Sequence, residues 1–212
     1  NTTPTYDRVF KLQQRGIISA LPRISGVQSH QTDPVYRYSA SPGEWRELKP
    51  VTGSPSVAQA AMIGNPVSFP RVKALADEYV EIGGTAAFQV MQVTEQAIMD
   101  SMLLANKHGH IACTQGGECL AGLLAAKEYG IIEENAYCLL DATAHALKFM
   151  DFQNMYFDNS LPPSFGVTPD PSLVNKPELL ISPEERAALS EEGFILKTAD
   201  KMVKKLNLKS KN

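Results

Sequence analysis

Apolar side chains recur at helical spacing in four stretches of the chain, and each stretch is followed by a glycine. The predicted helices cover residues 5–15, 70–82, 94–109 and 116–129. Apolar residues three and four positions apart form one buried stripe on a helix. Glycine just past the stripe supplies the left-handed conformation that commonly ends a helix. The pattern therefore predicts four amphipathic helices with glycine stops.

Short apolar runs lie between these helices and are apolar on both faces. They predict β-strands near residues 23–28, 87–93, 110–113 and 137–142. Strands that are apolar on both faces and alternate with helices are typical of a parallel sheet covered on both sides. The predicted fold class is therefore α/β, with a Rossmann-like parallel sheet and helices on both faces.

The alternation stops near Lys148, which predicts two parts. Residues 1–149 should form the sheet domain, and residues 150–212 a Pro-rich extension that leads to one final helix. Residues 39–56 contain Pro, Gly and Ser and are expected to form a surface loop.

Composition excludes several classes of partner. The chain has 212 residues, is 43% hydrophobic and 20% charged, and carries a formal net charge of −3. That balance predicts a globular protein with no general attraction for nucleic acid, and no apolar run approaches the length that spans a membrane. The three cysteines, Cys113, Cys119 and Cys138, lie in or beside apolar segments, which indicates a reducing, cytoplasmic setting. The opening residues carry no Met and no signal peptide, so we expect a piece of a longer protein.

Two turns contain residues suited to bind a ligand. Thr114, Gly116 and Gly117 precede an apolar helix, where small residues let backbone N–H groups approach an anion. Gly64 and Asn65 lie in the turn IGNP, where both tolerate unusual backbone angles. The alternative for each is a structural turn, and the sequence leaves it open.

A polar cluster ends the apolar run YCLLDATAHALKF. If residues 137–143 are extended, Asp141 and Thr143 share one face and place a carboxylate and a hydroxyl side by side. This arrangement resembles a site. The alternative is that Asp141 or Thr143 caps the turn that follows.

Metal and hydrolase chemistry receive little support. His108, His110 and Cys113 are ligand types, but a second group with matching spacing is lacking. The chain has no nucleophile elbow sequence, and no cysteine stands in a context that marks a reactive thiolate.

Four segments in order resemble the C-terminal part of the threonine synthase family, within the fold-type-II pyridoxal-phosphate enzymes. They are LPRISGVQS, AAMIGNPVSF, VTEQAIMDSMLLANKHGHIACTQGGECLAGL and CLLDATAHALKF, across roughly residues 16–149. The resemblance implies a pyridoxal 5'-phosphate site, with Thr143 at the pyridine nitrogen and the Gly64–Asn65 turn on the substrate side. The residues that it assigns to the cofactor are Thr143, Thr114, Gly116, Gly117, Asn1 and Thr2.

The resemblance also implies a missing part. The family's Schiff-base lysine lies in an N-terminal segment of the type SFKDR or SxK, and no lysine here has that context. The run TQGGE departs from the Glu-Pro-Ala-Ser type often found in relatives, which leaves the roles of Thr114 and Glu118 open. Catalytic residues are therefore expected to lie outside this chain.

The activity that the resemblance implies is conversion of O-phospho-L-homoserine and water to L-threonine and phosphate. The expected partners are the missing N-terminal half of the enzyme and further copies in a homo-oligomer. By itself this chain should be inactive. The alternatives are another fold-type-II enzyme, such as threonine dehydratase or cysteine synthase, and a non-catalytic nucleotide-binding module.

Overall fold

The structure is a computed structural model that describes residues 2–40 and 47–208 of the chain. Asn1 and part of the predicted loop 39–56 lie outside the described residues. The chain divides into two compact units, Asn1–Val174 and Asn175–Asn212, and each is described by itself.

The first unit contains most of the regular structure. Its helices are α1 (Thr2–Gln14), α2 (Pro34–Ala40), α3 (Phe69–Gly83), α4 (Glu95–Lys107), α5 (Thr114–Glu128) and α6 (Met150–Phe157). Its strands are β1 (Ile24–Ser29) and β2 (Phe88–Val93). Short 3-10 helices are η1 (Gln59–Ala61), η2 (Thr85–Ala87), η3 (Ala146–Phe149), η4 (Pro163–Phe165) and η5 (Pro171–Leu173). The four predicted helices are thus confirmed as α1, α3, α4 and α5, with shifted ends.

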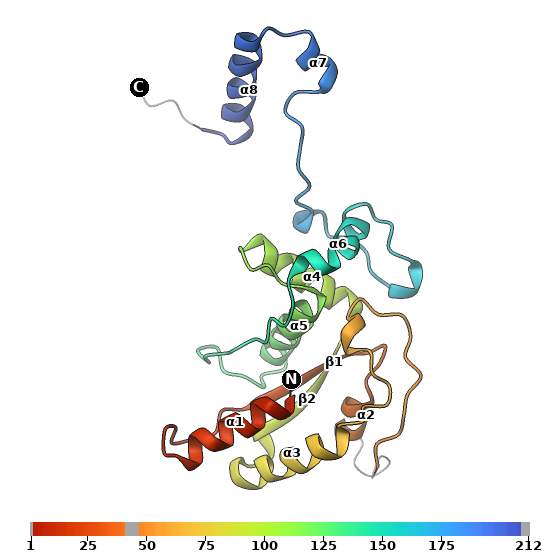
Figure 1. Ribbon diagram of the computed structural model, residues 1–212, viewed down its shortest axis with the longest axis vertical. Helices are drawn as coiled ribbons and strands as arrows, with labels where there is room; N and C mark the ends of the chain where they lie inside the picture. The colour runs from red at the N-terminus through yellow and green to blue at the C-terminus, as the bar shows by residue number, and fades with distance from the viewer. Residues whose placement is uncertain (1, 41–46, 209–212) are drawn as a thin grey trace. The chain divides into compact units, whose positions relative to one another are not determined.

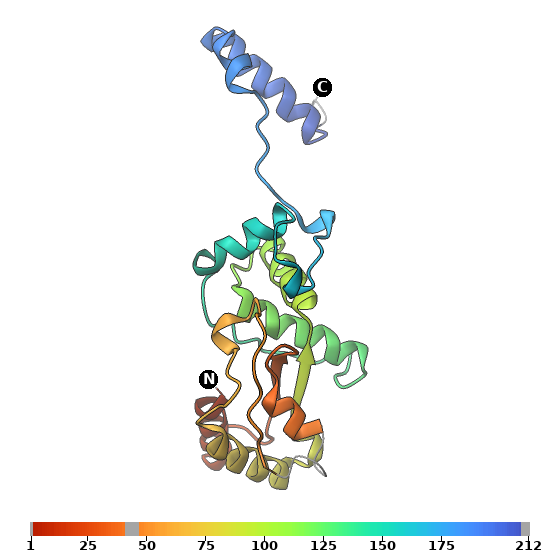
Figure 2. The same cartoon turned by 90° about the vertical axis from the view of Figure 1, so that its right-hand side faces the viewer.

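The two strands form a parallel sheet with helices on both faces, as predicted (Figures 1 and 2). The register runs from Ile24 opposite Phe88 to Ser29 opposite Val93. Phe88 packs with the aromatic side chains of α1 and α3, whereas Val93 packs with α4 and α5. Helices therefore pack on both faces of the sheet, which stay partly exposed at most positions, and the α/β fold class is confirmed.

Two predicted strands are wrong for this chain. Residues 110–113 contribute only an isolated antiparallel bridge between Ala112 and His145. Residues 137–142 are not in a strand. A strand needs a neighbouring strand for its N–H and C=O groups, and the N–H of Ala112 is taken instead by the side-chain oxygen of Asn106 at 2.8 Å.

The glycine stops are confirmed where they were predicted. Positive φ angles, between 67° and 87°, occur at Gly16, Gly84, Gly109 and Gly130. A residue with a Cβ adopts this left-handed conformation at a cost, so glycine fixes where each helix ends.

The predicted final helix is two helices, α7 (Pro183–Ala187) and α8 (Glu191–Lys205). The break has a local cause, because the Ser190 side chain accepts a hydrogen bond from the N–H of Gly193 at 3.1 Å. This is an N-cap, which starts a new helix rather than continuing the old one.

Two apolar clusters hold the first unit together. The smaller contains Tyr6, Phe10, Tyr79 and Ala87. The larger contains Val57, Ala58, Val93, Ile98, Met99, Met102, Leu103, Ala121, Phe152 and Tyr156. Because α6 supplies two of these side chains, the segment after residue 149 takes part in the core of this unit. The predicted division into domains after that residue stays a prediction about the longer protein.

Helices α4 and α5 approach each other closely at Gly117. A Cβ at this position would lie 2.5 Å from the carbonyl oxygen of Ile98 and 2.9 Å from the amide nitrogen of Met102. Both are backbone atoms of α4, so neither can move away without shifting the helix. Glycine at position 117 therefore serves the packing of the helix pair.

We expect Gly117→Ala to destabilise the chain by roughly 1–3 kcal/mol, because the added methyl group forces the two helices apart. Gly116→Ala is the matched control, since its Cβ would meet the nearest side-chain atom, in Ala112, at 3.2 Å. Its contact requires only a small adjustment, and alanine is the better helix former. Urea unfolding of both variants measures the difference. Equal stabilities would show that the helix contact does not require glycine.

Candidate functional site

The first turn of α5 is the centre of the candidate site. Cys113 is its N-cap and accepts a hydrogen bond on Sγ from the N–H of Gly116 at 3.4 Å. The N–H of Gly117 donates to the carbonyl of Cys113 at 2.9 Å. The amides of both glycines therefore already have partners within the turn.

Three buried polar side chains of this turn have atoms without a hydrogen-bond partner among the described residues. They are the Thr114 hydroxyl, both amide atoms of Gln115 and Oε1 of Glu118. Their residues are 0%, 8% and 5% exposed. Leaving such a group unpaired costs about 1–3 kcal/mol. A concentration of them at one helix terminus indicates a place completed by a ligand, by water or by another segment.

Burial changes the acidity of Glu118. Loss of solvent raises the pKa of its carboxyl to about 7, and the nearby Glu95 carboxylate adds to the rise. A hydrogen bond with the backbone of Ser29 acts in the opposite direction. Near neutral pH this residue therefore exchanges a proton, which a surface glutamate does not do.

A second buried carboxylate, Glu95, is fully bonded. Its oxygens accept from the Ser29 hydroxyl, from the Ser56 hydroxyl at 2.9 and 3.0 Å, and from the N–H of Val57 at 2.6 Å. These bonds join the end of β1 and the segment before η1 to the start of α4. The sequence alone does not reveal this cluster, because a glutamate just after the N-cap Thr94 fits an exposed first turn equally well.

The predicted site residue Thr143 lies in an exposed, irregular segment beside α5. A Cβ built on Gly116 would lie 3.9 Å from Cα of Ala142. Cys119 Sγ lies 3.5 Å from the carbonyl oxygen of Asp141, to which it donates. The structure thus brings the segment of Thr143 to the first turns of the helix that Thr114 begins.

The cap of the following turn is neither Asp141 nor Thr143, so that alternative is wrong. His145 caps η3, with its Nδ1 accepting from the N–H of Leu147 at 3.2 Å. The extended strand geometry that would align Asp141 and Thr143 on one face is also not observed. Their shared face was inferred from a strand that does not form in this chain.

The IGNP turn is constrained differently from the prediction. Neither Gly64 nor Asn65 has a positive φ. Gly64 is instead pressed against Val51, whose carbonyl oxygen would lie 2.0 Å from an added Cβ. The N–H of Val51 donates to the carbonyl of Gly64 at 3.0 Å. Close backbone approach therefore requires this glycine, and Asn65 is exposed.

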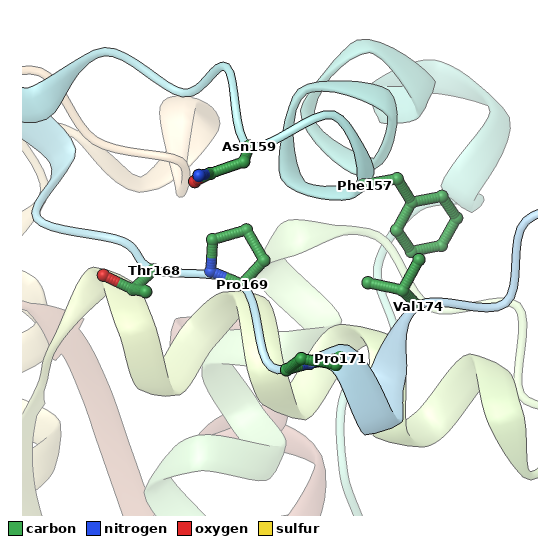
Figure 3. A pocket seen from close by; sticks show the side chains of 6 residues that line it. All are labelled: Phe157, Asn159, Thr168, Pro169, Pro171 and Val174. Atoms are coloured by element: carbon green, nitrogen blue, oxygen red, sulfur yellow. The ribbon is translucent and has the colours of Figure 1, made fainter.

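Two open hollows lie away from the first turn of α5. One of about 420 Å³ lies between the end of α6 and η5 (Figure 3); it is lined by Phe157, Asn159, Thr168, Pro169, Pro171 and Val174. The other, of about 650 Å³, lies over β2, α2 and α3, and its lining includes Tyr38, Phe69, Val72, Phe88 and Val90. Neither contains a predicted site residue.

Within residues 2–40 and 47–208, no group of three or more His, Cys, Asp or Glu side chains is placed to hold a metal ion. No helix in the same ranges has the length and apolar character needed to cross a bilayer.

The fold and the buried polar turn define an α/β protein with a candidate ligand site at a helix N-terminus beside its sheet. Comparison with known proteins finds similarity to three threonine synthases. The chain is 27% identical to threonine synthase 2, chloroplastic, of Arabidopsis thaliana over 74% of its length. It is 33% identical to a threonine synthase of Methanocaldococcus jannaschii over 64% of its length, and 30% identical to one of Methanosarcina acetivorans over 70%.

These matches confirm the resemblance to part of threonine synthase. The chain spans about a third of the length of these relatives, 29%, 32% and 35% respectively. No family model matches the chain. The similarity is therefore to a portion of an enzyme.

The raised pKa of Glu118 predicts how stability depends on pH. A carboxyl whose pKa is higher in the folded state keeps its proton longer there, so its contribution is present below pH 4.5 and is lost as pH rises through about 7. We expect Glu118→Gln to remove this loss, which is on the order of 3 kcal/mol at most. Urea unfolding of both proteins between pH 4.5 and 8 measures it.

Glu128→Gln is the control, because Glu128 is an exposed glutamate at the other end of the same helix. It should follow the wild-type pH profile. If Glu118→Gln does the same, the carboxyl of Glu118 titrates as a solvated group.

Proposed function

We propose that this chain is the C-terminal part of a threonine synthase that converts O-phospho-L-homoserine and water to L-threonine and phosphate. The similarity to three threonine synthases carries the proposal. The buried polar atoms at the start of α5 that have no partner among the described residues support it, because such atoms favour completion by another group. The same reasoning supports a lyase that acts in amino-acid biosynthesis.

The cofactor of this enzyme would be pyridoxal 5'-phosphate. The residues present fit one side of such a group through side chains: the Thr114 hydroxyl has no partner among the described residues, and Thr143 offers an exposed hydroxyl on the segment beside the first turns of α5. When bound, the cofactor supplies an electron sink for charge that develops on the substrate carbons.

Thr143 and Thr114 have distinct proposed roles. The Thr143 hydroxyl would donate to the pyridine nitrogen, which needs a neutral donor rather than a carboxylate if it is to stay unprotonated. The Thr114 hydroxyl, together with Gly116, would line the cofactor side of the turn, and Gly117, which the sequence also assigned to the cofactor, would support that turn by its contact with α4. Gly64 and Asn65 would form the substrate side, and Asn1 and Thr2 the end of a phosphate loop.

The remainder of the enzyme would supply the Schiff-base lysine and the neighbouring strands. The exposed segment before Thr143 supports this proposal, since Tyr137 and Leu139 are entirely exposed to solvent. Apolar side chains at strand-like spacing with no cover favour an additional layer. We therefore propose that the missing N-terminal half covers this segment, and that the assembled enzyme acts in the cytoplasm.

We expect the 212-residue chain, supplied with pyridoxal 5'-phosphate, to release no phosphate from O-phospho-L-homoserine. The reason is that no lysine here stands in the sequence context of the Schiff-base residue. The polypeptide from the complete reading frame should release phosphate and form L-threonine in equal amounts. Offering each substrate in turn decides between enzymes, because a threonine dehydratase would form a 2-oxo acid and ammonia from L-threonine, and a cysteine synthase would need an activated serine and sulfide to form cysteine. Turnover by the chain alone would contradict the proposal.

We expect Thr143→Ala in the complete protein to lower turnover by roughly fivefold, the worth of one hydrogen bond of about 1 kcal/mol. Thr143→Ser keeps the hydroxyl and should retain activity, and Asp141→Asn should have a milder effect. Thr85→Ala is the control, because it removes another exposed hydroxyl from the first unit. Turnover, the cofactor absorption spectrum and Tm are measured together.

If Asp141→Asn loses turnover while Thr143→Ala turns over normally, both at unchanged Tm, the proposed role belongs to Asp141 and not to Thr143. If Thr143→Ala lowers Tm together with turnover, whereas Thr143→Ser lowers neither, Thr143 has a structural role.

A further inference from the structure

The described part of the second unit has no core of its own. Among the described residues 175–208, no side chain is buried. A segment of this size with no buried apolar side chains cannot be stabilised by hydrophobic burial. Its two helices must therefore be held by polar contacts, by docking on another surface, or by both.

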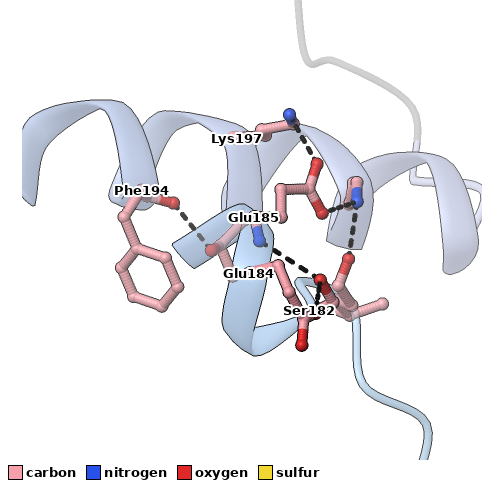
Figure 4. A network of polar contacts seen from close by, with 8 residues as sticks. Ser182, Glu184, Glu185, Phe194 and Lys197 are labelled. Carbon is pink, nitrogen blue, oxygen red and sulfur yellow. Dashed lines mark hydrogen bonds and ion pairs between the residues drawn. The ribbon is translucent and has the colours of Figure 1, made fainter. Parts of the chain in front are cut away.

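Polar contacts hold one face of α8 against α7 and the segment before it (Figure 4). Glu185 pairs with Lys197 at 2.5 Å and with Lys201 at 2.8 Å, and these lysines lower the pKa of its carboxyl to about 2. The guanidinium of Arg186 lies 4.3 Å from the ring centre of Phe194. The charged face of α8 is thus the face turned toward α7.

The other face of α8 is apolar and exposed. Its side chains are 45–64% exposed and include Ile195, Leu196, Met202, Val203 and Leu206. Together with Ala199, they follow alternating steps of three and four residues, which places them in one stripe. A stripe with this spacing is the type that packs against a second helix.

The charges at the ends of α8 determine which helix fits. Its first turn carries Glu191 and Glu192, and its last turn carries Lys204 and Lys205. Glu191, Lys204 and Lys205 form ion pairs within the unit, yet their side chains remain 76%, 75% and 57% exposed. Such exposed pairs contribute little by themselves, so both ends can still face an outside partner.

A second copy of α8 running in the opposite direction matches this distribution. At each end of the pair, the acidic start of one helix then faces the basic end of the other. The helix dipoles are also antiparallel. A parallel pair would place like charges side by side. A two-fold interface requires a surface that is complementary to itself, and the apolar stripe with opposite charges at its ends meets that requirement.

We propose that this α8 face is an interaction surface for a second copy of the chain, which packs antiparallel through Ile195, Ala199, Met202 and Leu206. The two-fold axis passes near Ala199, close to the middle of the helix. Because the stripe is short, the association is reversible and depends on protein concentration.

Sedimentation equilibrium of the 212-residue chain tests the surface. Ile195→Glu and Met202→Glu should each weaken self-association by at least about tenfold, because a charge would be buried in the stripe. Ile17→Glu is the matched control, since Ile17 is 64% exposed and Ile195 is 58% exposed. It should associate like the wild type. A monomeric wild type, or wild-type association of both α8 variants, would overturn the proposal.

Disulfide trapping tests the orientation, in a Cys138→Ser background that removes the exposed native thiol. In an antiparallel pair, Ala199→Cys lies near the axis and should cross-link to itself. Leu206→Cys lies seven residues further along, about 10 Å from the axis, so its two copies stand about 20 Å apart and should not cross-link. Equal cross-linking at both positions would indicate a parallel pair and would reject the antiparallel arrangement.

Discussion

The close approach of α5 to its two neighbours is the constraint on which the candidate site depends. Gly117 lies directly against the backbone of α4, and a Cβ at Gly122 would lie 2.4 Å from Val27 of β1. With no side chain at these points, α5 sits deep between the helix layer and the sheet. Its first turn is consequently buried, which is why Thr114 is removed from solvent.

Two buried glutamates near this turn show how partners decide the properties of the same residue type. Glu95 is bonded by Ser29, Ser56 and the N–H of Val57, so its carboxylate fastens three segments of chain. Glu118 is buried with one oxygen that has no partner among the described residues, and burial raises its pKa to about 7. The hydrogen-bonded carboxylate of Glu95 stabilises the fold. Glu118 has fewer bonds and lies where a further group could supply a partner.

The two units of the chain depend on association in different ways. The first has two apolar cores and a two-stranded sheet whose outer edges have no further strand among the described residues. The second is organised by ion pairs around Glu185 and presents its apolar stripe outward. Since hydrophobic burial is the dominant stabilising term, both arrangements favour contact with further protein.

Local sequence determined the helices α1, α3, α4 and α5, because glycine stops and apolar periodicity act over a few residues and need no distant partner. It also indicated the resemblance to threonine synthase, which rests on motifs in order. Tertiary structure decided the features that depend on a neighbouring segment, namely the strands and the burial of charged side chains. Residues 110–113 and 137–142 have strand-like sequences but form no regular strand here, because a ladder of hydrogen bonds requires a second strand. The buried state of Glu95 and Glu118 was likewise decided by packing, since a carboxylate is exposed or buried according to the segments that fold over it.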